Sequence, residues 1–277
     1  MTARTTAILG KGGVGKTFFA SHLTMAFSYL GVKTLVVGCD QKQDTLRALS
    51  AETRPPLMDW LDSNDYDYAS IAPEQVTVPI GPYADAMELG ASPLLVGHYA
   101  AVLDEAFHYF SSHNLLDRYE QVIFDVTDER WDSVLAPLFR RVESVVGVTA
   151  ETPESLFVLN RLLRAAQIGG YELEYPLVLV GVVNNASRDP LAFERYVERT
   201  QCFPLMTVPD LPELAGLKAF HRTLFELKSL PQHLEQVLDG FVKIADMLRG
   251  EPLNIFPVSS LDDEEVWKLA PAVNLPS

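Results

Sequence analysis

Short apolar runs alternate along the chain with longer segments in which apolar residues recur every three or four positions. Such runs are typical of parallel strands buried on both faces, and the periodic segments are typical of helices that pack on a sheet. The alternation predicts an α/β fold with a mainly parallel central sheet flanked by helices. The predicted strands include residues 5–9, 32–38, 121–125, 143–149 and 177–183, and the predicted helices include residues 99–110, 152–166 and 233–248.

Residues 51–86 interrupt this pattern and are rich in Pro, Asp and Tyr. Within them, residues 56–61 are consistent with a short helix. Residues 76–80 are consistent with a short edge strand, because Pro79 cannot donate a hydrogen bond to a neighbouring strand. The competing interpretation of the stretch is a long excursion over the surface.

The motif GKGGVGKT at residues 10–17 lies between a predicted strand and a predicted helix. In the pattern G-x-x-x-x-G-K-T the glycines let phosphate groups approach the main chain, and successive amides bind an anion at the helix N-terminus. We expect Lys16 to contact the β- and γ-phosphates and the Thr17 hydroxyl to ligate Mg²⁺. The predicted fold class is therefore a P-loop NTPase three-layer sandwich. The predicted nucleotide-binding loop comprises Gly10, Gly12, Gly13, Val14, Gly15, Lys16, Thr17 and Phe18.

Two carboxylates follow predicted strands directly. Asp40 comes just after the strand at residues 32–38, and Asp125 ends the apolar run at residues 121–125. Because ligands bind at the carboxyl ends of parallel strands, we expect both side chains to lie beside the phosphates. Asp125 matches the Walker B carboxylate, which holds a Mg²⁺-bound water.

Lys11 stands directly after the first glycine of the loop, where an ordinary P-loop requires no lysine. The form KGGVGKT resembles the deviant Walker A (SIMIBI-class) ATPases. That group includes the iron proteins of nitrogenase and of protochlorophyllide and chlorophyllide reductase, and the partition and division-site ATPases. In that group the early lysine reaches the nucleotide of the other subunit. The resemblance therefore implies an ATP-dependent homodimer in which Lys11 acts across the interface.

Residues 37–44 read VGCDQKQD and resemble the iron-protein segment V-G-C-D-P-K-x-D more than the partition-ATPase version. The resemblance implies that Asp40 positions the attacking water or the Mg²⁺ shell. It also implies that Asp44 belongs to the first nucleotide-sensing switch. Gln41 replaces the proline of that family, which leaves the switch backbone freer.

The same resemblance implies further site residues along the chain. Glu129 stands where the family has a carboxylate near the hydrolytic water. Asn185 matches an adenine-recognising asparagine, and Pro209 and Asp210 are weaker candidates for the base pocket. A turn-forming role for Asn185 is the competing interpretation. The implied catalytic residues are Lys11, Lys16, Asp40, Asp125 and Glu129, and the implied Mg²⁺ ligands are Thr17, Asp44 and Asp125.

The chain departs from the iron proteins at the two positions where they carry cluster-ligating cysteines. Residues 87–98 resemble the segment V-E-x-G-x-P-x-x-G-x-G-C, but its last position holds His98, and the second cysteine position holds Asp132. A 4Fe-4S cluster shared between two subunits takes two thiolates from each chain. We therefore expect no iron-sulfur cluster. His98 and Asp132 either fill a vacated site as ordinary polar residues or form a mixed N/O site for Zn²⁺ or Fe²⁺ across a dimer.

Length and charge narrow the class of protein further. The chain has 277 residues, enough for a full α/β core, and a net charge of −15 from 22 basic and 37 acidic residues. That balance argues against nonspecific binding to nucleic acid or to an anionic membrane. The first predicted strand begins almost at the N-terminus and no long apolar run occurs, so we expect a cytoplasmic protein. We expect a P-loop ATPase domain over residues 1–250 and an acidic, proline-containing tail over residues 251–277, which wraps a partner subunit or is flexible.

Together these features predict a Mg-ATP-hydrolysing, homodimeric, iron-protein-like ATPase without a 4Fe-4S cluster. Its nucleotide state would control dimer closure and the docking of a second protein. Two alternatives stay open. The first is a nucleotide-switched regulatory or partition- or division-site-type binding protein with little turnover. The second is a metal- or electron-delivering homologue that uses His98 and Asp132 as ligands.

Overall fold

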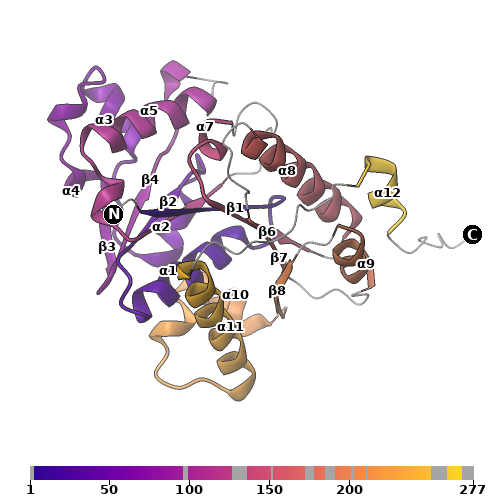
Figure 1. Ribbon diagram of the computed structural model, residues 1–277. Helices are drawn as coiled ribbons and strands as arrows, with labels where there is room; N and C mark the ends of the chain where they lie inside the picture. The colour runs from indigo at the N-terminus through magenta and orange to yellow at the C-terminus, as the bar shows by residue number, and fades with distance from the viewer. Residues whose placement is uncertain are drawn as a thin grey trace, which may run out of the picture.

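The computed structural model describes residues 3–95, 99–126, 136–150, 152–171, 178–184, 191–200, 203–209, 211–250 and 261–269. Within these residues an eight-stranded sheet runs through the centre of the molecule, in the order β3-β4-β2-β5-β1-β6-β7-β8 (Figure 1). The strands are β1 (Arg4–Leu9), β2 (Thr34–Gly38), β3 (Val78–Gly81), β4 (Ala84–Glu88), β5 (Gln121–Asp125), β6 (Ser144–Thr149), β7 (Val178–Asn184) and β8 (Phe203–Val208).

The predicted α/β fold with a mainly parallel sheet is confirmed. Neighbouring strands pair in parallel throughout, except that β3 and β4 are antiparallel. Strands β1, β2, β5 and β6 are buried along almost their whole length. This agrees with their apolar sequences, because a central parallel strand has helices over both faces.

Helices cover both faces of the sheet (Figure 1). One face packs against α3, α5, α7 and α8 in a core that includes Phe107 and Phe124. The other face packs against α1, α2, α10 and α11 in a core that includes Phe19 and Phe241. In the described part of the chain, no helix is both long and apolar enough to cross a membrane. The helices are α1 (Lys16–Tyr29), α2 (Asp44–Leu49), α3 (Leu57–Ser63), η1 (Tyr68–Ser70), α4 (Pro73–Val76), η2 (Pro93–Leu95), α5 (Tyr99–Ser112), η3 (Leu116–Arg118), α7 (Ala136–Phe139), α8 (Pro153–Tyr171), α9 (Leu191–Thr200), α10 (Pro212–Ala219), η4 (Leu224–Glu226), α11 (Gln232–Arg249) and α12 (Asp263–Trp267).

Residues 51–86 include the predicted short helix, observed as α3, and the predicted edge strand, observed as β3. They also contain α4, and they lead into the parallel strand β4. Leu57, Met58 and Leu61 lie on one side of α3 and are fully buried in the core. The competing interpretation, a long surface excursion, is wrong because these side chains are part of the core.

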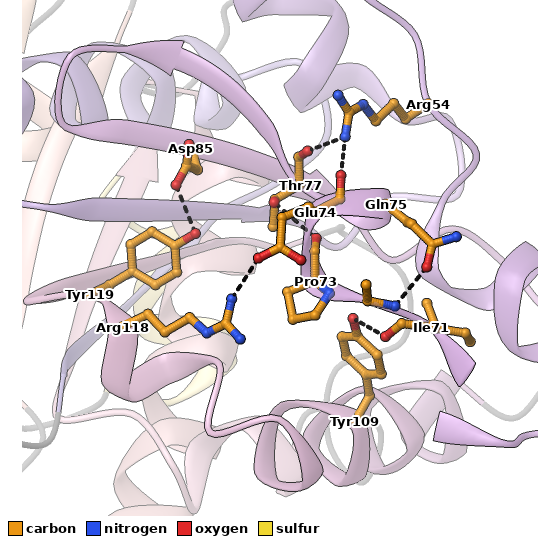
Figure 2. A network of polar contacts seen from close by, with 11 residues as sticks. Arg54, Ile71, Pro73, Glu74, Gln75, Thr77, Asp85, Tyr109, Arg118 and Tyr119 are labelled. Atoms are coloured by element: carbon orange, nitrogen blue, oxygen red, sulfur yellow. Dashed lines mark hydrogen bonds and ion pairs between the residues drawn. The ribbon is translucent and has the colours of Figure 1, made fainter. Parts of the chain in front are cut away.

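Side chains bonded to main-chain carbonyl groups hold this stretch in place (Figure 2). The Arg54 guanidinium donates to the carbonyl oxygens of Glu74 and Thr77, the latter at 2.7 Å. From α5, the Tyr109 hydroxyl donates to the carbonyl oxygen of Ile71 at 3.1 Å. These bonds satisfy carbonyl groups that lie outside the sheet ladder, and the Tyr109 bond connects the segment to α5.

Residues 261–269 pack on α8 of the same chain and contain α12. The buried Asn160 side chain donates from Nδ2 to the carbonyl oxygen of Leu261 at 2.8 Å and accepts from the Leu261 amide at 3.1 Å. Arg164 Nη2 donates to the same carbonyl oxygen at 2.8 Å, and Val266 is fully buried. This part of the predicted tail is therefore folded onto its own subunit. The domain boundary at residue 250 stays a prediction.

Candidate nucleotide-binding site

The loop between β1 and α1 needs glycine for two different reasons. Gly10 has a φ of 156°, and a Cβ at this residue would lie 2.1 Å from the carbonyl oxygen of Val148 in β6. Gly13 and Gly15 have φ values of 81° and 98°, in the left-handed region that glycine adopts without strain. The loop thus fits tightly against the end of β6 and then turns sharply into α1 at Lys16.

Lys16 is held inside this loop by the loop's own main chain. Its side chain is only 9% exposed, and Nζ donates to the carbonyl oxygen of Lys11 at 3.1 Å. The ammonium group therefore lies at the N-terminal turn of α1, where the free amides of a helix also attract an anion. Lys11 is half-buried, whereas Gly12 and Gly13 are exposed. The predicted anion site combines a fixed cation with accessible main-chain amides.

The sheet register sets Asp125 between the phosphate-binding loop and the end of β2. Asp125 lies opposite Ile8 of β1 on one side and opposite Gly38 of β2 on the other. Its carbonyl oxygen accepts from the Cys39 amide at 2.9 Å. Because Asp40 follows immediately, the carboxyl ends of three adjacent strands bring the loop, Asp125 and Asp40 to one edge of the sheet.

Asp125 is a buried carboxyl group surrounded by compensating groups. Burial raises the pKa of Asp125, while hydrogen bonds from Thr17 and Thr45 and the charge of Lys16 act to lower it. The Thr45 hydroxyl donates to Asp125 Oδ2 at 2.8 Å. Since desolvation disfavours the charged form, a divalent cation at this edge would stabilise the ionised carboxylate.

The segment after β2 turns directly into α2. Asp40 Oδ1 accepts from the Lys42 amide at 2.9 Å, and the Asp40 carbonyl oxygen accepts from the Gln43 amide at 3.1 Å. Gln43 has a φ of 56°, which is uncommon for a residue with a side chain. Asp44 is the first residue of α2 and is half-buried. Asp40 therefore shapes the turn that leads into α2, whose residue Thr45 donates to Asp125.

Thr45 and Glu88 also lie at this edge, although neither was predicted as a site residue. Glu88 ends β4, is 2% exposed, and accepts from the Leu46 amide at 2.6 Å through Oε1. Burial raises the pKa of Glu88 to about 8. For Glu88 the signal was weak, because residues 84–88 contain Asp85 and lack the apolar run that precedes Asp125. For Thr45 the only signal was its place next to Asp44.

The donor set at this edge suits Mg²⁺ bound with a nucleotide. The predicted ligands Thr17, Asp44 and Asp125 carry oxygen atoms, which this hard cation prefers, and a hydrogen bond joins Thr17 to Asp125. The absence of a Cβ at Gly10 lets the loop lie close against β6, with its amides available to phosphate. Among the residues that the structure describes, no group of three or more His, Cys, Asp and Glu side chains is arranged to hold a metal ion. In a site of this kind, phosphate oxygens and water would complete the Mg²⁺ shell.

Not all of the predicted site residues can be placed. Pro209 follows β8, on the far side of β6 and β7 from the phosphate-binding loop, and is half-buried. Phe18 packs against His22 and Phe241, with ring centroids 4.0 Å and 6.2 Å apart. The predicted residues that lie outside the described part of the chain are Glu129, Asn185, Asp210, His98 and Asp132.

Comparisons with known proteins identify a related sequence and similar folds. Over 269 residues the chain is 30% identical to the light-independent protochlorophyllide reductase iron-sulfur ATP-binding protein of Halorhodospira halophila. The matched region covers 96% of this chain and 88% of that protein. Similar solved structures include the MinD cell division protein of Aquifex aeolicus, with a TM-score of 0.65, 16% identity, and coverage of 92% of this chain and 100% of that chain. Apo McdA of Cyanothece gives a TM-score of 0.68, 14% identity, and coverage of 90% and 100%.

At these low identities the solved structures support the fold alone. The family evidence is broader, because residues 4–274 match the description "4Fe-4S iron sulfur cluster binding proteins, NifH/frxC family". The predicted class of enzyme, a P-loop ATPase, agrees with that match. This chain therefore belongs to the NifH/frxC family of 4Fe-4S iron sulfur cluster binding proteins.

Proposed function

We propose that this chain is a Mg-ATP-hydrolysing homodimeric ATPase that functions without a 4Fe-4S cluster. Its nucleotide state would control dimer closure and the docking of a second protein. The observation that carries the proposal is the register that sets Asp125 opposite both Ile8 and Gly38. That register supports a shared site for the phosphate-binding loop, Asp125 and Asp40 at one sheet edge.

Each side chain at this edge has its own task in the proposed reaction. Bound Mg²⁺ would neutralise charge on the phosphate oxygens. Lys16 would exchange its bond to the Lys11 carbonyl oxygen for bonds to the β- and γ-phosphates, and Asp40 would orient the attacking water. Lys11 would reach the nucleotide of the partner subunit. The proposed Mg²⁺ ligands are Thr17, Asp44 and Asp125, and Glu129, Asn185, Pro209 and Asp210 keep their proposed roles at the hydrolytic water and the base.

The cysteines of this chain support a protein without a 4Fe-4S cluster. The sequence contains two cysteines, Cys39 and Cys202. Cys39 is fully buried, its thiol donates to the Val37 carbonyl oxygen at 3.6 Å, and burial raises its pKa, which disfavours the thiolate. A shared cluster needs two thiolates from each chain, whereas the matching positions hold His98 and Asp132. This difference supports an ATPase that has lost the redox centre.

Protein purified without oxygen is expected to contain neither stoichiometric iron nor acid-labile sulfide, because thiolate ligands are missing where the family carries them. Elemental analysis and the visible absorbance spectrum measure this directly. Intact iron-sulfur absorbance would contradict the proposal. Stoichiometric Zn²⁺ or Fe²⁺ that is lost in His98→Ala would instead support the alternative in which His98 and Asp132 form a metal site.

Lys11→Ala tests the proposed dimeric mechanism. If Lys11 acts across the interface, the variant should stay monomeric with ATP and hydrolyse it about 100-fold more slowly, because one cation at the transferred phosphate is lost. Light scattering after size exclusion and a phosphate-release assay measure the two effects. Lys33→Ala is the matched control, because Lys33 is an exposed lysine that lies 5.3 Å from the Tyr119 ring. Unchanged hydrolysis and dimerisation in Lys11→Ala would show that this mechanism is wrong.

A nucleotide-switched binding protein with little turnover is the second candidate. The solved MinC:MinD complex of Aquifex aeolicus has a similar fold, at a TM-score of 0.67 and 15% identity. The observation in this chain that favours the second candidate is that His98 and Asp132 stand where the family carries cluster cysteines. A protein without a cluster would transfer no electrons, and its function would then be the nucleotide-dependent formation of a complex. ATP-driven dimerisation without measurable hydrolysis would favour it over the first candidate.

A further inference from the structure

The segment from Cys39 to Leu46 is held at both ends by residues outside the phosphate-binding loop. At one end, the Tyr99 hydroxyl of α5 donates to the carbonyl oxygen of Cys39. At the other end, Glu88 Oε1 of β4 accepts from the Leu46 amide at 2.6 Å. The segment between these two bonds contains Asp40 and the first residues of α2. Its position is therefore set from β4 and α5 as well as from the nucleotide edge.

Glu88 provides a contact that α2 does not make for itself. Gln43, the residue before α2, gives no side-chain hydrogen bond to the helix. The Leu46 amide is one of the first amides of α2, which have no partner within the helix. Glu88 satisfies this amide from another strand. Without that acceptor the buried amide would lose its partner, at a cost comparable to a hydrogen bond.

The surroundings of Glu88 indicate that its place is specific. A Cβ at Gly38 would lie 1.9 Å from Glu88 Oε2 and 2.8 Å from Thr45 Oγ1, so only glycine leaves room for both side chains. Glu88 Oε2 is buried and has no hydrogen-bond partner among the described residues. A buried carboxyl group with one unsatisfied oxygen is unfavourable for stability. Its position is better explained by the hold on α2 than by packing.

The same segment also contacts the nucleotide edge. Thr45 lies next to Leu46, and its hydroxyl donates to Asp125 Oδ2 at 2.8 Å. A shift of α2 away from Glu88 would therefore stretch the bond between Thr45 and Asp125. Motion at the nucleotide edge would likewise be transmitted to Glu88 and then to residues 89–95, which follow it. The Leu89 amide donates to the Gly38 carbonyl oxygen at 2.8 Å, which keeps the start of that stretch beside β2.

We propose that Glu88 and Tyr99 are positioning residues that hold the segment Cys39–Leu46 in place for ATP hydrolysis and transmit its movements to residues 89–95. Neither side chain needs to touch the nucleotide. The role of this segment in hydrolysis and the transmission of its movements to residues 89–95 rest on the proposed ATPase function. The hold on α2 concerns the free protein.

The hold on α2 is tested by hydrogen exchange on the nucleotide-free protein. Glu88→Met keeps the length of the side chain but removes the acceptor, so amides of α2 should exchange roughly tenfold faster, while those of α1 stay unchanged. Glu88→Gln keeps a carbonyl oxygen for the Leu46 amide and should restore slow exchange. If α2 exchanges equally slowly in all three proteins, Glu88 does not hold it.

Tyr99→Phe tests the second bond with a smaller change. Tyr109→Phe is its matched control, because Tyr109 lies on the same helix as Tyr99. Its phenol also donates to a carbonyl oxygen, that of Ile71, which is not part of the nucleotide site (Figure 2). We expect single-turnover hydrolysis to fall about tenfold in Tyr99→Phe and to stay within about twofold in Tyr109→Phe, with ADP affinity unchanged in both. Equal rates in the two variants would overturn the role of Tyr99.

The transmitted movement is read from residues 89–95. ATP with Mg²⁺ should change their hydrogen exchange in the wild-type protein and in Glu88→Gln, but not in Glu88→Met. If ATP changes the exchange equally in Glu88→Met, the transmission is wrong. If Glu88→Met does not fold, the same comparison between Tyr99→Phe and Tyr109→Phe decides. A wild-type protein that shows no hydrolysis would overturn the proposed function, while the exchange of α2 would still decide whether Glu88 holds that helix.

Discussion

Lys16→Ala is expected to reduce ATP hydrolysis by at least about 100-fold, with little loss of folding stability. The Lys16 ammonium group already lies inside the phosphate-binding loop, where it donates to the Lys11 carbonyl oxygen at 3.1 Å. A cation fixed beforehand at the transferred phosphate stabilises charge without reorganisation during the reaction. Steady-state phosphate release and calorimetric titration with ATP measure turnover and affinity.

Lys33→Ala serves as the control for this change too, because it removes an exposed lysine. Lys33 comes just before β2, whereas the loop follows the end of the parallel strand β1, so the two lie at opposite ends of the sheet. The control should hydrolyse ATP at the wild-type rate. Thermal unfolding of both variants separates a loss of chemistry from a loss of structure. Turnover within about threefold of wild type in Lys16→Ala would contradict the assignment of the phosphate site.

Gly10→Ala is expected to lower the free energy of unfolding by at least about 3 kcal/mol. The added Cβ would lie 2.1 Å from the Val148 carbonyl oxygen, and the φ of 156° is strained for any residue with a side chain. The Cβ is bonded directly to the main chain of the loop, and the Val148 oxygen belongs to the main chain of β6. Since neither atom can rotate away, the loop must shift away from β6. We therefore expect nucleotide binding to be lost together with stability.

Gly31→Ala is the control that separates these two causes. Gly31 has a φ of 74°, but a Cβ there would meet no atom within 4 Å. Its cost should be about 1 kcal/mol, from backbone strain alone. Urea unfolding at one pH compares the two variants. Equal losses in Gly10→Ala and Gly31→Ala would mean that the contact with β6 does not matter.

The phosphate-binding loop could be predicted from sequence because its chemistry is local. The glycines, Lys16 and Thr17 occupy fixed positions between one strand and one helix, so the motif and its flanks give the site directly. Asp125 could be predicted for a similar reason, since a carboxylate that ends a buried parallel strand lies at the edge of the sheet where ligands bind. The alternation of apolar runs likewise gave most of the parallel sheet.

Glu88 and Thr45 could not be assigned from sequence because their contacts depend on tertiary register. Glu88 reaches Leu46 only because β4 pairs with β2 so that Gly38 lies opposite Glu88. Thr45 reaches Asp125 only because β5 lies on the other side of β2. Strand order is not encoded in local periodicity, so neither contact follows from the pattern of residues.

The bond pair between Asn160 and Leu261 has a consequence for the biosynthesis of the protein. Asn160 lies in the middle of α8, yet its partner is about 100 residues further along the chain. A product that stopped before residue 261 would leave the buried Asn160 amide without these two bonds and would lack Leu261, Val266 and Leu269, which are buried in the same core as Leu156 and Leu159 of α8. We therefore expect products truncated before this point to be less stable and more easily degraded by proteases than the full chain.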